Sequence, residues 1–360
     1  MASKKYSFLA GAMCLLASYG FAQTTGGTTT GNVGAYDVSD SSVVPSRRMP
    51  QHTEFMNGTY NYPAKPRNQW EFGIKGGLFT LSSDVPAKLG WAAGAHIRKA
   101  LGYVFSLRLN YMYGKGRGLS YQPASGYAKN DAWNDVNAPR PGNLPAGQGY
   151  TGNVYYNYKA TVQDLSLEGI FSLNNVRFHK SRTGVNFYAL IGAGAMIYDT
   201  YVNALNENNQ NYQGLFTGID ATGGYKDRGE IKDQLEDGMD DSYETRAENH
   251  GEQRAKLFGQ TLKPVGHVGV GVAFKLSNRI NLAIEDRFTF TKDDLLDGQR
   301  WQEQPGNDPA LTRDYDMYNL VSLGLNFNLG AKSTEPLWWL NPLDYAYSEI
   351  RNPRLMRIPK

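Results

Sequence analysis

Acidic and basic side chains recur at alternate positions within short apolar segments of this chain. They are Glu71, Lys75, Arg98, Arg108, Glu168, Glu285 and Arg287. Acids and bases that are buried together form ion pairs, because an unpaired charge inside a protein is strongly destabilising. The pattern therefore predicts an interior ionic network. In the structural interpretation, these groups form a polar core in which every charge is paired. In the functional interpretation, they gate a narrow path through the protein that fills with water intermittently.

Other residues that could do chemistry are scattered. His96, His179, His250 and His267 show no spacing that gathers metal ligands. The acidic run DQLEDGMDDSYE, residues 233–244, lacks the ligand spacing of a calcium loop. No Asp/His or Ser/His set stands out, so we predict neither an enzyme nor a cofactor. The catalytic alternative is an enzyme built on a small β-barrel, with its active residues near the outer rim of the barrel.

The elements that carry these charges show a period of two. In GYVFSLRLNYMYGK, residues 102–115, the outer face has aromatic residues at both ends and leucines between them. Its members are Tyr103, Phe105, Leu107, Leu109, Tyr111 and Tyr113. This arrangement is typical of a transmembrane strand that crosses two aromatic girdles.

The same alternation predicts eight strands, and an even number suits a closed bacterial barrel. Their ranges are 69–81, 89–100, 103–114, 154–173, 185–199, 261–276, 279–291 and 315–329. The fourth changes phase near Gln163 to Leu165, which predicts a bulge. The seventh places Asp286 on its lipid face, a local misfit.

The connections support the same architecture. Those after strands two, four and six are tight, whereas those after three, five and seven run through 115–153, 200–260 and 292–314. Such asymmetry is typical of periplasmic turns and extracellular loops. A soluble lipocalin-like barrel is the alternative, but it would leave the outward Tyr and Leu rows in water. We therefore predict an all-β fold: an eight-stranded, antiparallel, up-and-down transmembrane β-barrel over residues 68–330.

The N-terminal region carries targeting information. Residues 1–22 have two lysines, an apolar run and a small-residue ending, which predicts a signal peptide cleaved between Ala22 and Gln23. A lipoprotein signal at Cys14 is the alternative, but the preceding Met13 fits it poorly. Cleavage would remove that sole cysteine and lower the formal net charge of +3 by two, giving no reason to expect nucleic acid as a partner. Residues 23–67, rich in Thr, Gly, Ser, Asn and Pro, predict a flexible leader.

An apolar segment follows the last strand, within a predicted periplasmic tail and linker over residues 331–360. In PLWWLNPLDYAYSEI, residues 336–350, Asn341 and Pro342 are suited to begin a short helix. Amphipathic rings here suit the headgroup level or the lower opening of the barrel. We predict periplasmic docking by Leu337, Trp338, Trp339, Leu340, Tyr345 and Tyr347.

Two stretches resemble a known family. VQDLSLEGIFSLNNVRFH and EPLWWLNPLDYAYSEI, the latter followed by the Pro-punctuated basic RNPRLMRIPK, look like the N-terminal half of Bacteroidetes-type OmpA-family outer-membrane proteins. The resemblance covers about residues 68–360. In that family, acidic calcium-binding repeats and a peptidoglycan-binding domain follow the barrel, and an Asp and an Arg of that domain hold diaminopimelate. We expect that domain to be missing from these 360 residues, so none of its binding residues is carried over.

The resemblance implies an outer-membrane anchor of a cell-envelope structural protein, with periplasmic N- and C-terminal segments. Its expected partners are outer-membrane lipid, other proteins of an outer-membrane complex, and peptidoglycan only through a missing C-terminal domain. Two alternatives are partner binding through the long loops, as in an adhesin, and a narrow porin-like conductance.

Overall fold

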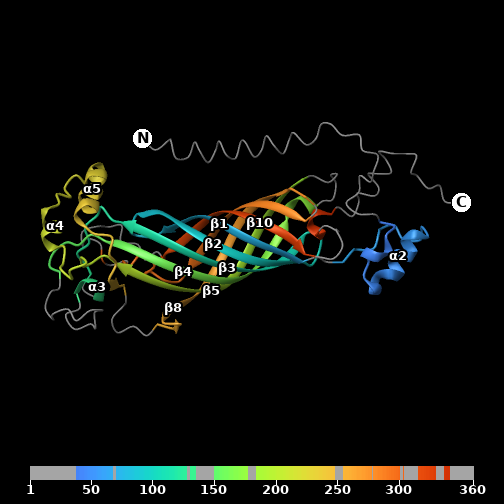
Figure 1. The fold of residues 1–360 in the computed structure, drawn as a ribbon, viewed down its shortest axis with the longest axis horizontal. Helices are drawn as coiled ribbons and strands as arrows, with labels where there is room; N and C mark the ends of the chain where they lie inside the picture. The colour runs from blue at the N-terminus through green and yellow to red at the C-terminus, as the bar shows by residue number, and fades with distance from the viewer. Residues whose placement is uncertain are drawn as a thin grey trace.

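A closed barrel forms the body of the molecule (Figure 1). The computed structural model describes residues 38–67, 70–127, 130–134, 150–176, 184–247, 254–277, 279–300, 303, 315–329 and 336–340. Eight long strands lie within these ranges: β1 (Trp70–Ser82), β2 (Ala87–Ala100), β3 (Phe105–Leu119), β4 (Asn157–Ser172), β5 (Val185–Val202), β8 (Gln260–Lys275), β9 (Ile280–Thr291) and β10 (Met317–Leu329). Each pairs antiparallel with the next, and β1 pairs with β10. The predicted eight-stranded, up-and-down barrel is confirmed.

The strand register fixes the width of the barrel. From Phe72 the ladder passes through paired residues on every strand and returns to β1 at Ser82. The intermediate residues are Ile97, Leu109, Leu167, Ala193, Gly266, Phe290 and Met317. One circuit thus advances from position 72 to position 82, so the strands are strongly tilted, by roughly 35–45°. An eight-stranded barrel of this kind has an interior that side chains fill.

The two ends of the barrel differ. At the turn end, Leu101 N–H and Gly102 N–H both donate to Phe105 O, which closes the β2–β3 turn. The opposite, loop end carries short helices and strands (Figure 1). Those in the described residues include α3 (Asp131–Asn134), α4 (Gln213–Gly218), η4 (Gly224–Asp227), α5 (Arg228–Gly238), β6 (Thr245–Arg246) and β7 (Lys256–Leu257). In the described residues, no helix is long and apolar enough to cross a membrane.

The bulge predicted near Gln163 to Leu165 is wrong. Strand β4 pairs with both neighbours without a register shift, and its inward residues alternate regularly from Tyr158 to Ser172. The alternation of apolar and polar residues along β4 changes phase because its surroundings change. Near the loop end, the inward face of β4 contacts an apolar layer, and its outward face is polar. The register irregularity of the sheet lies instead in β2, between Lys88 and Trp91.

The described part of the predicted flexible leader contains ordered structure. It includes α2 (Met49–Met56), with a proline in its first turn, and the short helices η1 (Ser41–Val43) and η2 (Ser46–Arg48). Val43, Val44 and Ala64 form a small buried cluster. Average composition concealed these few apolar residues, which differ from the Thr- and Gly-rich residues before them.

Candidate functional site

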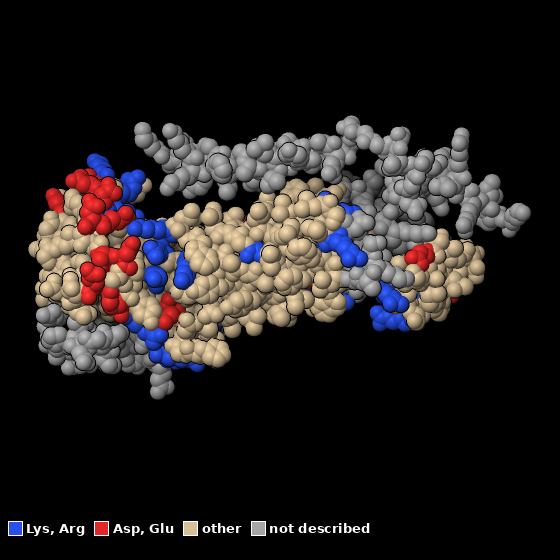
Figure 2. Space-filling view, in the orientation of Figure 1, with Lys and Arg blue, Asp and Glu red and all other residues tan. Residues whose placement is uncertain are grey.

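An apolar belt surrounds the middle of the barrel exterior. Its exposed aliphatic members are Ile74, Leu78, Ile97, Leu109, Leu165, Leu167, Ile191, Val268, Val270 and Leu323. Exposed aromatic residues border it at the turn end (Trp70, Phe72, Phe171, Phe187) and at the loop end (Trp91, Tyr111, Phe288, Phe290). Figure 2 shows this middle band almost free of charged side chains, with charges gathered toward both ends. Exposed apolar surface of this extent marks a surface that contacts lipid or protein.

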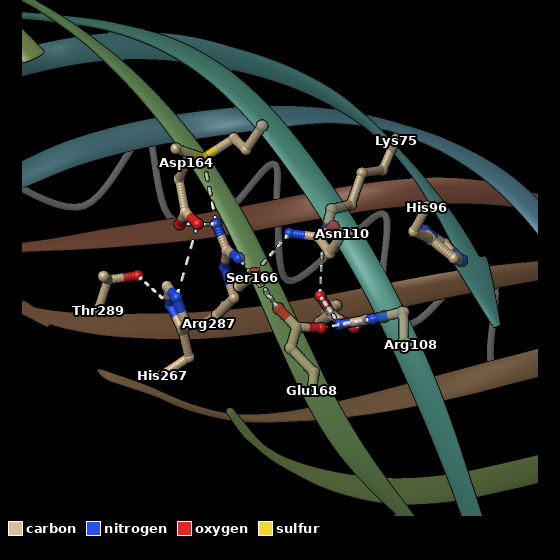
Figure 3. Close-up of polar contacts among 12 residues, drawn as sticks. Lys75, His96, Arg108, Asn110, Asp164, Ser166, Glu168, His267, Arg287 and Thr289 are labelled. Atoms are coloured by element: carbon tan, nitrogen blue, oxygen red, sulfur yellow. Dashed lines mark hydrogen bonds and ion pairs between the residues drawn. The ribbon is translucent and has the colours of Figure 1, made fainter. Parts of the chain in front are cut away.

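Arg108 is the centre of the interior ionic network (Figure 3). Its guanidinium donates through Nε to Glu168 Oε2 at 2.5 Å and through both terminal nitrogens to Glu285, at 2.6 and 3.0 Å. Lys75 Nζ lies 3.0 Å from Glu285 Oε1, and Tyr188 OH donates to Glu285 Oε2 at 3.1 Å. Two carboxylates from β4 and β9 are therefore held by one arginine of β3.

A second arginine continues the network toward the loop end. Arg287 Nη1 donates to Glu168 Oε1 at 3.1 Å, and its Nη2 lies 3.2 Å from Asp164 Oδ2. Tyr318 OH donates to Asp164 at 2.7 Å, and His267 Nε2 lies 3.6 Å from the other carboxylate oxygen. Figure 3 shows Asp164, Arg287 and His267 converging inside the barrel.

A looser group lies nearer the turn end. Glu71 Oε1 is 3.9 Å from both His96 Nε2 and Arg98 Nη1. Asn281 donates to Glu71 Oε2 at 3.0 Å. A cavity of about 10 Å³ beside these residues has room for about one water. The interior thus holds four cations and four carboxylates in near contact, which is a packed polar core.

The structure places all seven predicted network residues inside the barrel, buried and in two adjoining ionic groups. Sequence reasoning missed Asp164, His96, His267 and the tyrosines that complete it. Asp164 was hidden by the misplaced bulge, since a regular period of two would have turned it inward beside Glu168. His96 and His267 stood on inward positions, but were assessed only as metal ligands. In the described residues, no group of three His, Cys, Asp or Glu is arranged to hold a metal.

Tail residues close the turn end. Four residues of the tail are buried there: Leu337, Trp338, Trp339 and Leu340. They pack with Ala100 of β2 and with inward residues of β4, β5, β8 and β9. The Arg98 guanidinium carbon lies 4.2 Å from the centre of the Trp338 ring. Asn175 Nδ2 donates to Trp338 O at 2.9 Å. These four residues are called the plug below. The other two predicted docking residues, Tyr345 and Tyr347, lie outside the described residues, as does the predicted helix.

The loop end is closed by an apolar layer and contains buried carboxylates, three of which have no cationic partner among the described residues. Phe79, Met112, Met196 and Leu320 belong to the buried cluster across the barrel above the network. Beyond it, Asp297 accepts from the N–H groups of Val85 and Gln299, both at 2.8 Å, and burial raises its pKa to about 7. This contact joins the 292–316 connection to the β1–β2 loop.

Two further carboxylates accompany it. Glu303 accepts hydrogen bonds from Tyr156 OH and Asn130 Nδ2, and burial raises its pKa to about 8. Asp316 accepts from Leu296 N–H at 2.8 Å, and burial together with the Asp297 charge raises its pKa well above the ordinary value. Among the described residues, no Lys or Arg pairs with Asp297, Glu303 or Asp316. Sequence reasoning did not select Asp297 and Glu303, because no periodicity places residues of long loops. Asp316 was missed although it stood at an inward position of the predicted strand 315–329.

Asp286, the predicted misfit on the outer face, has a neighbour that explains it. Asn319 of β10 donates to Asp286 Oδ1 at 2.6 Å. Both side chains are partly buried on the outer face, near the exposed Phe288 at the loop-end side of the belt. The amide therefore supplies one of the hydrogen bonds that lipid could not.

Comparisons with known proteins do not identify a family. No family of known proteins matches the sequence, and no curated protein matches it. Among solved structures, the chain is similar to Neisserial surface protein A (TM-score 0.32, 8% identity, 72% of this chain and 97% of that one). It is also similar to Ail of Yersinia pestis (0.31, 9%, 73% and 99%) and to the N-terminal β-barrel domain of Pseudomonas aeruginosa OprF (0.27, 11%, 73% and 100%). With TM-scores this low, these similarities carry no argument, and the fold rests on its own strand pairing.

Proposed function

We propose that this chain is an outer-membrane β-barrel that anchors a cell-envelope structural protein, with its turn end in the periplasm. The observation that carries the proposal is the apolar belt, bordered by aromatic residues on both sides and wrapped around a charged, closed interior. In water such a surface would promote aggregation, whereas in a bilayer its contact with acyl chains stabilises the folded barrel. Strands of 12 to 18 residues exceed the roughly 9–11 that a tilted membrane strand needs.

Flotation with phosphatidylcholine vesicles tests this proposal. The purified chain should fold and rise with the vesicles, and a Leu109→Asp, Leu167→Asp variant should remain in the dense fractions. Tyr225→Asp, which changes an exposed apolar residue outside the belt, is the matched control and should float. Equal flotation of both variants would contradict a lipid-facing belt.

The finer role that we propose is a tether toward peptidoglycan, or a subunit of a larger outer-membrane assembly. Its support is the plug, which holds residues that follow the last strand inside the turn end. A version extended beyond residue 360 should sediment with purified peptidoglycan, and residues 23–360 alone should not. Sedimentation of the shorter version would contradict a tether supplied by a later domain.

A second candidate function, capture of a partner by the loop end, is favoured by the order of that region. Trp133, Tyr150 and Phe216 pack together there, with ring centroids 5.2 to 6.4 Å apart. Deletion of residues 205–255 should then leave a folded barrel in the membrane but abolish partner capture. A narrow conductance has less support, because the apolar layer and the plug lie at opposite ends of the polar interior.

A further inference from the structure

Three cations face outward on adjacent strands near the loop end. The register places Lys88 of β2 opposite Arg117 of β3, and Arg117 opposite Lys159 of β4. Directly opposite side chains have Cβ atoms about 4.5–5.5 Å apart, and like charges in such positions are destabilising. The sheet therefore gathers positive charges that repel one another.

Only one end of this row has a carboxylate partner among the described residues. Lys88 pairs with Glu236 of α5 at 2.9 Å, and both side chains are about half exposed. Among the described residues, no carboxylate forms an ion pair with Arg117 or Lys159. Both instead lie near the ring of Tyr243, whose centre is 5.8 Å from the guanidinium carbon of Arg117 and 5.4 Å from Lys159 Nζ.

Tyr243 acts as a platform for the two cations. Its hydroxyl donates to Asn157 Oδ1 at 3.0 Å, which helps to fix the ring beside β4. A ring face attracts both cations but forms no ion pair with them. The donors of Arg117 and Lys159 are therefore available to an anion.

The position of the row relative to the belt indicates what that anion is attached to. Lys115 lies two residues from Arg117 toward the belt and is opposite Trp91. The rings of Trp91 and Tyr113 are 5.9 Å apart, at the loop-end border of the belt. Figure 2 shows Lys and Arg side chains between the uncharged band and the acidic loop end. A ligand that fits both features has acyl chains below and several negative charges above.

We propose that Arg117 and Lys159, with Lys88 and Lys115 beside them, bind an outer-leaflet lipid whose headgroup carries at least two phosphates. The inference rests on the proposed outer-membrane location. Guanidinium groups bind phosphate oxygens in a two-pronged geometry, and lysines add charge. The acyl chains lie against Leu109 and Leu165 of the belt.

Lipid retention in native mass spectrometry tests this inference. The chain is inserted into phosphatidylcholine vesicles that contain a minor fraction of bisphosphorylated lipid A, dephosphorylated lipid A or phosphatidylglycerol, and is then extracted gently. Arg117→Gln, Lys159→Gln is compared with Lys99→Gln, Arg279→Gln, which removes two outward cations at the turn end. We expect the loop-end variant to retain roughly tenfold less bisphosphorylated lipid. The control should match the unmodified chain.

Each other outcome overturns a defined part of the account. Equal retention by the two variants, or phosphatidylglycerol held as well as the bisphosphorylated lipid, would overturn the inference alone. Complete displacement of the lipid by inorganic phosphate would show a site for a free anion instead. A chain that does not insert into any vesicle would overturn the proposed function, and this inference with it.

Discussion

Buried carboxylates occur at two levels of this barrel and are neutralised in different ways. In the ionic network, Glu168 and Glu285 contact Arg108 at hydrogen-bond distance. At the loop end, Asp297 and Glu303 contact backbone N–H groups, a hydroxyl and an amide, and their pKa values are raised to about 7 and about 8. The first level is balanced by cations, whereas burial favours the protonated form of the carboxylates in the second. The second level should therefore respond to pH near neutrality.

The largest expected effect is on the network. Arg108→Ala leaves Glu168 and Glu285 without their shared partner, and breaking a buried ion pair costs about 3–5 kcal/mol. The free energy of unfolding should fall by that amount. It is measured by urea titration of the chain in vesicles, with the folded fraction read from the gel band that shifts when the sample is heated. Arg117→Ala, on the same strand but exposed, should cost under about 1 kcal/mol. Equal losses would show that the buried network does not stabilise the barrel.

The next effect concerns the plug at the turn end. Trp338→Ser with Trp339→Ser removes two buried rings, and loss of a buried Trp side chain costs about 3 kcal/mol or more. The tail should detach, so protease should cut faster near Asn341 while the barrel stays folded. Tyr225→Ser, which changes an exposed ring at the loop end, serves as the control. An unchanged cutting rate would count against docking.

A pH dependence is expected at the loop end. Raised pKa values mean that the folded loop end binds more protons than the unfolded chain between the ordinary and the raised values. Its free energy of unfolding should therefore fall as pH rises from about 4 to about 8, by about 1.4 kcal/mol for each pH unit over which a group stays protonated only in the folded state. Exchange of the Val85 and Leu296 amide hydrogens, corrected for intrinsic rates, should report this loss.

The network supplies the control for that titration. Amides of the β3–β4 ladder beside Arg108 should keep their relative protection across the same pH range. Asp297→Asn should weaken the pH response at Leu296, whose N–H group donates to Asp316, because it removes a charge that helps to raise the pKa of Asp316. Protection that increased with pH at Val85 would contradict the assignment of protonated carboxylates.

The smallest effect is expected on the outer face. Asp286→Asn keeps a side chain that can accept from Asn319 and removes the charge, so stability should change by less than about 1 kcal/mol. Urea titration in vesicles would detect a larger change. A loss of several kcal/mol would show that Asp286 has a partner comparable to those of the interior carboxylates.

The sequence predicted the network level far better than the loop end. A period of two places Glu71, Lys75 and Arg108 inward from local sequence alone, because each strand is regular. Asp164 was missed since the surroundings of β4 change along its length, and a local pattern cannot reveal what a face contacts. Asp297 is buried through a contact with Val85, more than two hundred residues away. Such pairs depend on how the loops fold together.

The most direct test of the central claim uses the scarcity of cysteine. The chain has one, Cys14, so with Cys14→Ser a single label can be placed at Leu167→Cys in the belt or at Tyr225→Cys at the loop end. These positions are similarly exposed, at 56% and 66%. In vesicles, a polarity-sensitive fluorophore at residue 167 should emit at shorter wavelength and be quenched by brominated acyl chains, whereas one at residue 225 should report water. Water-like emission from both positions in a folded barrel would contradict a membrane-spanning belt.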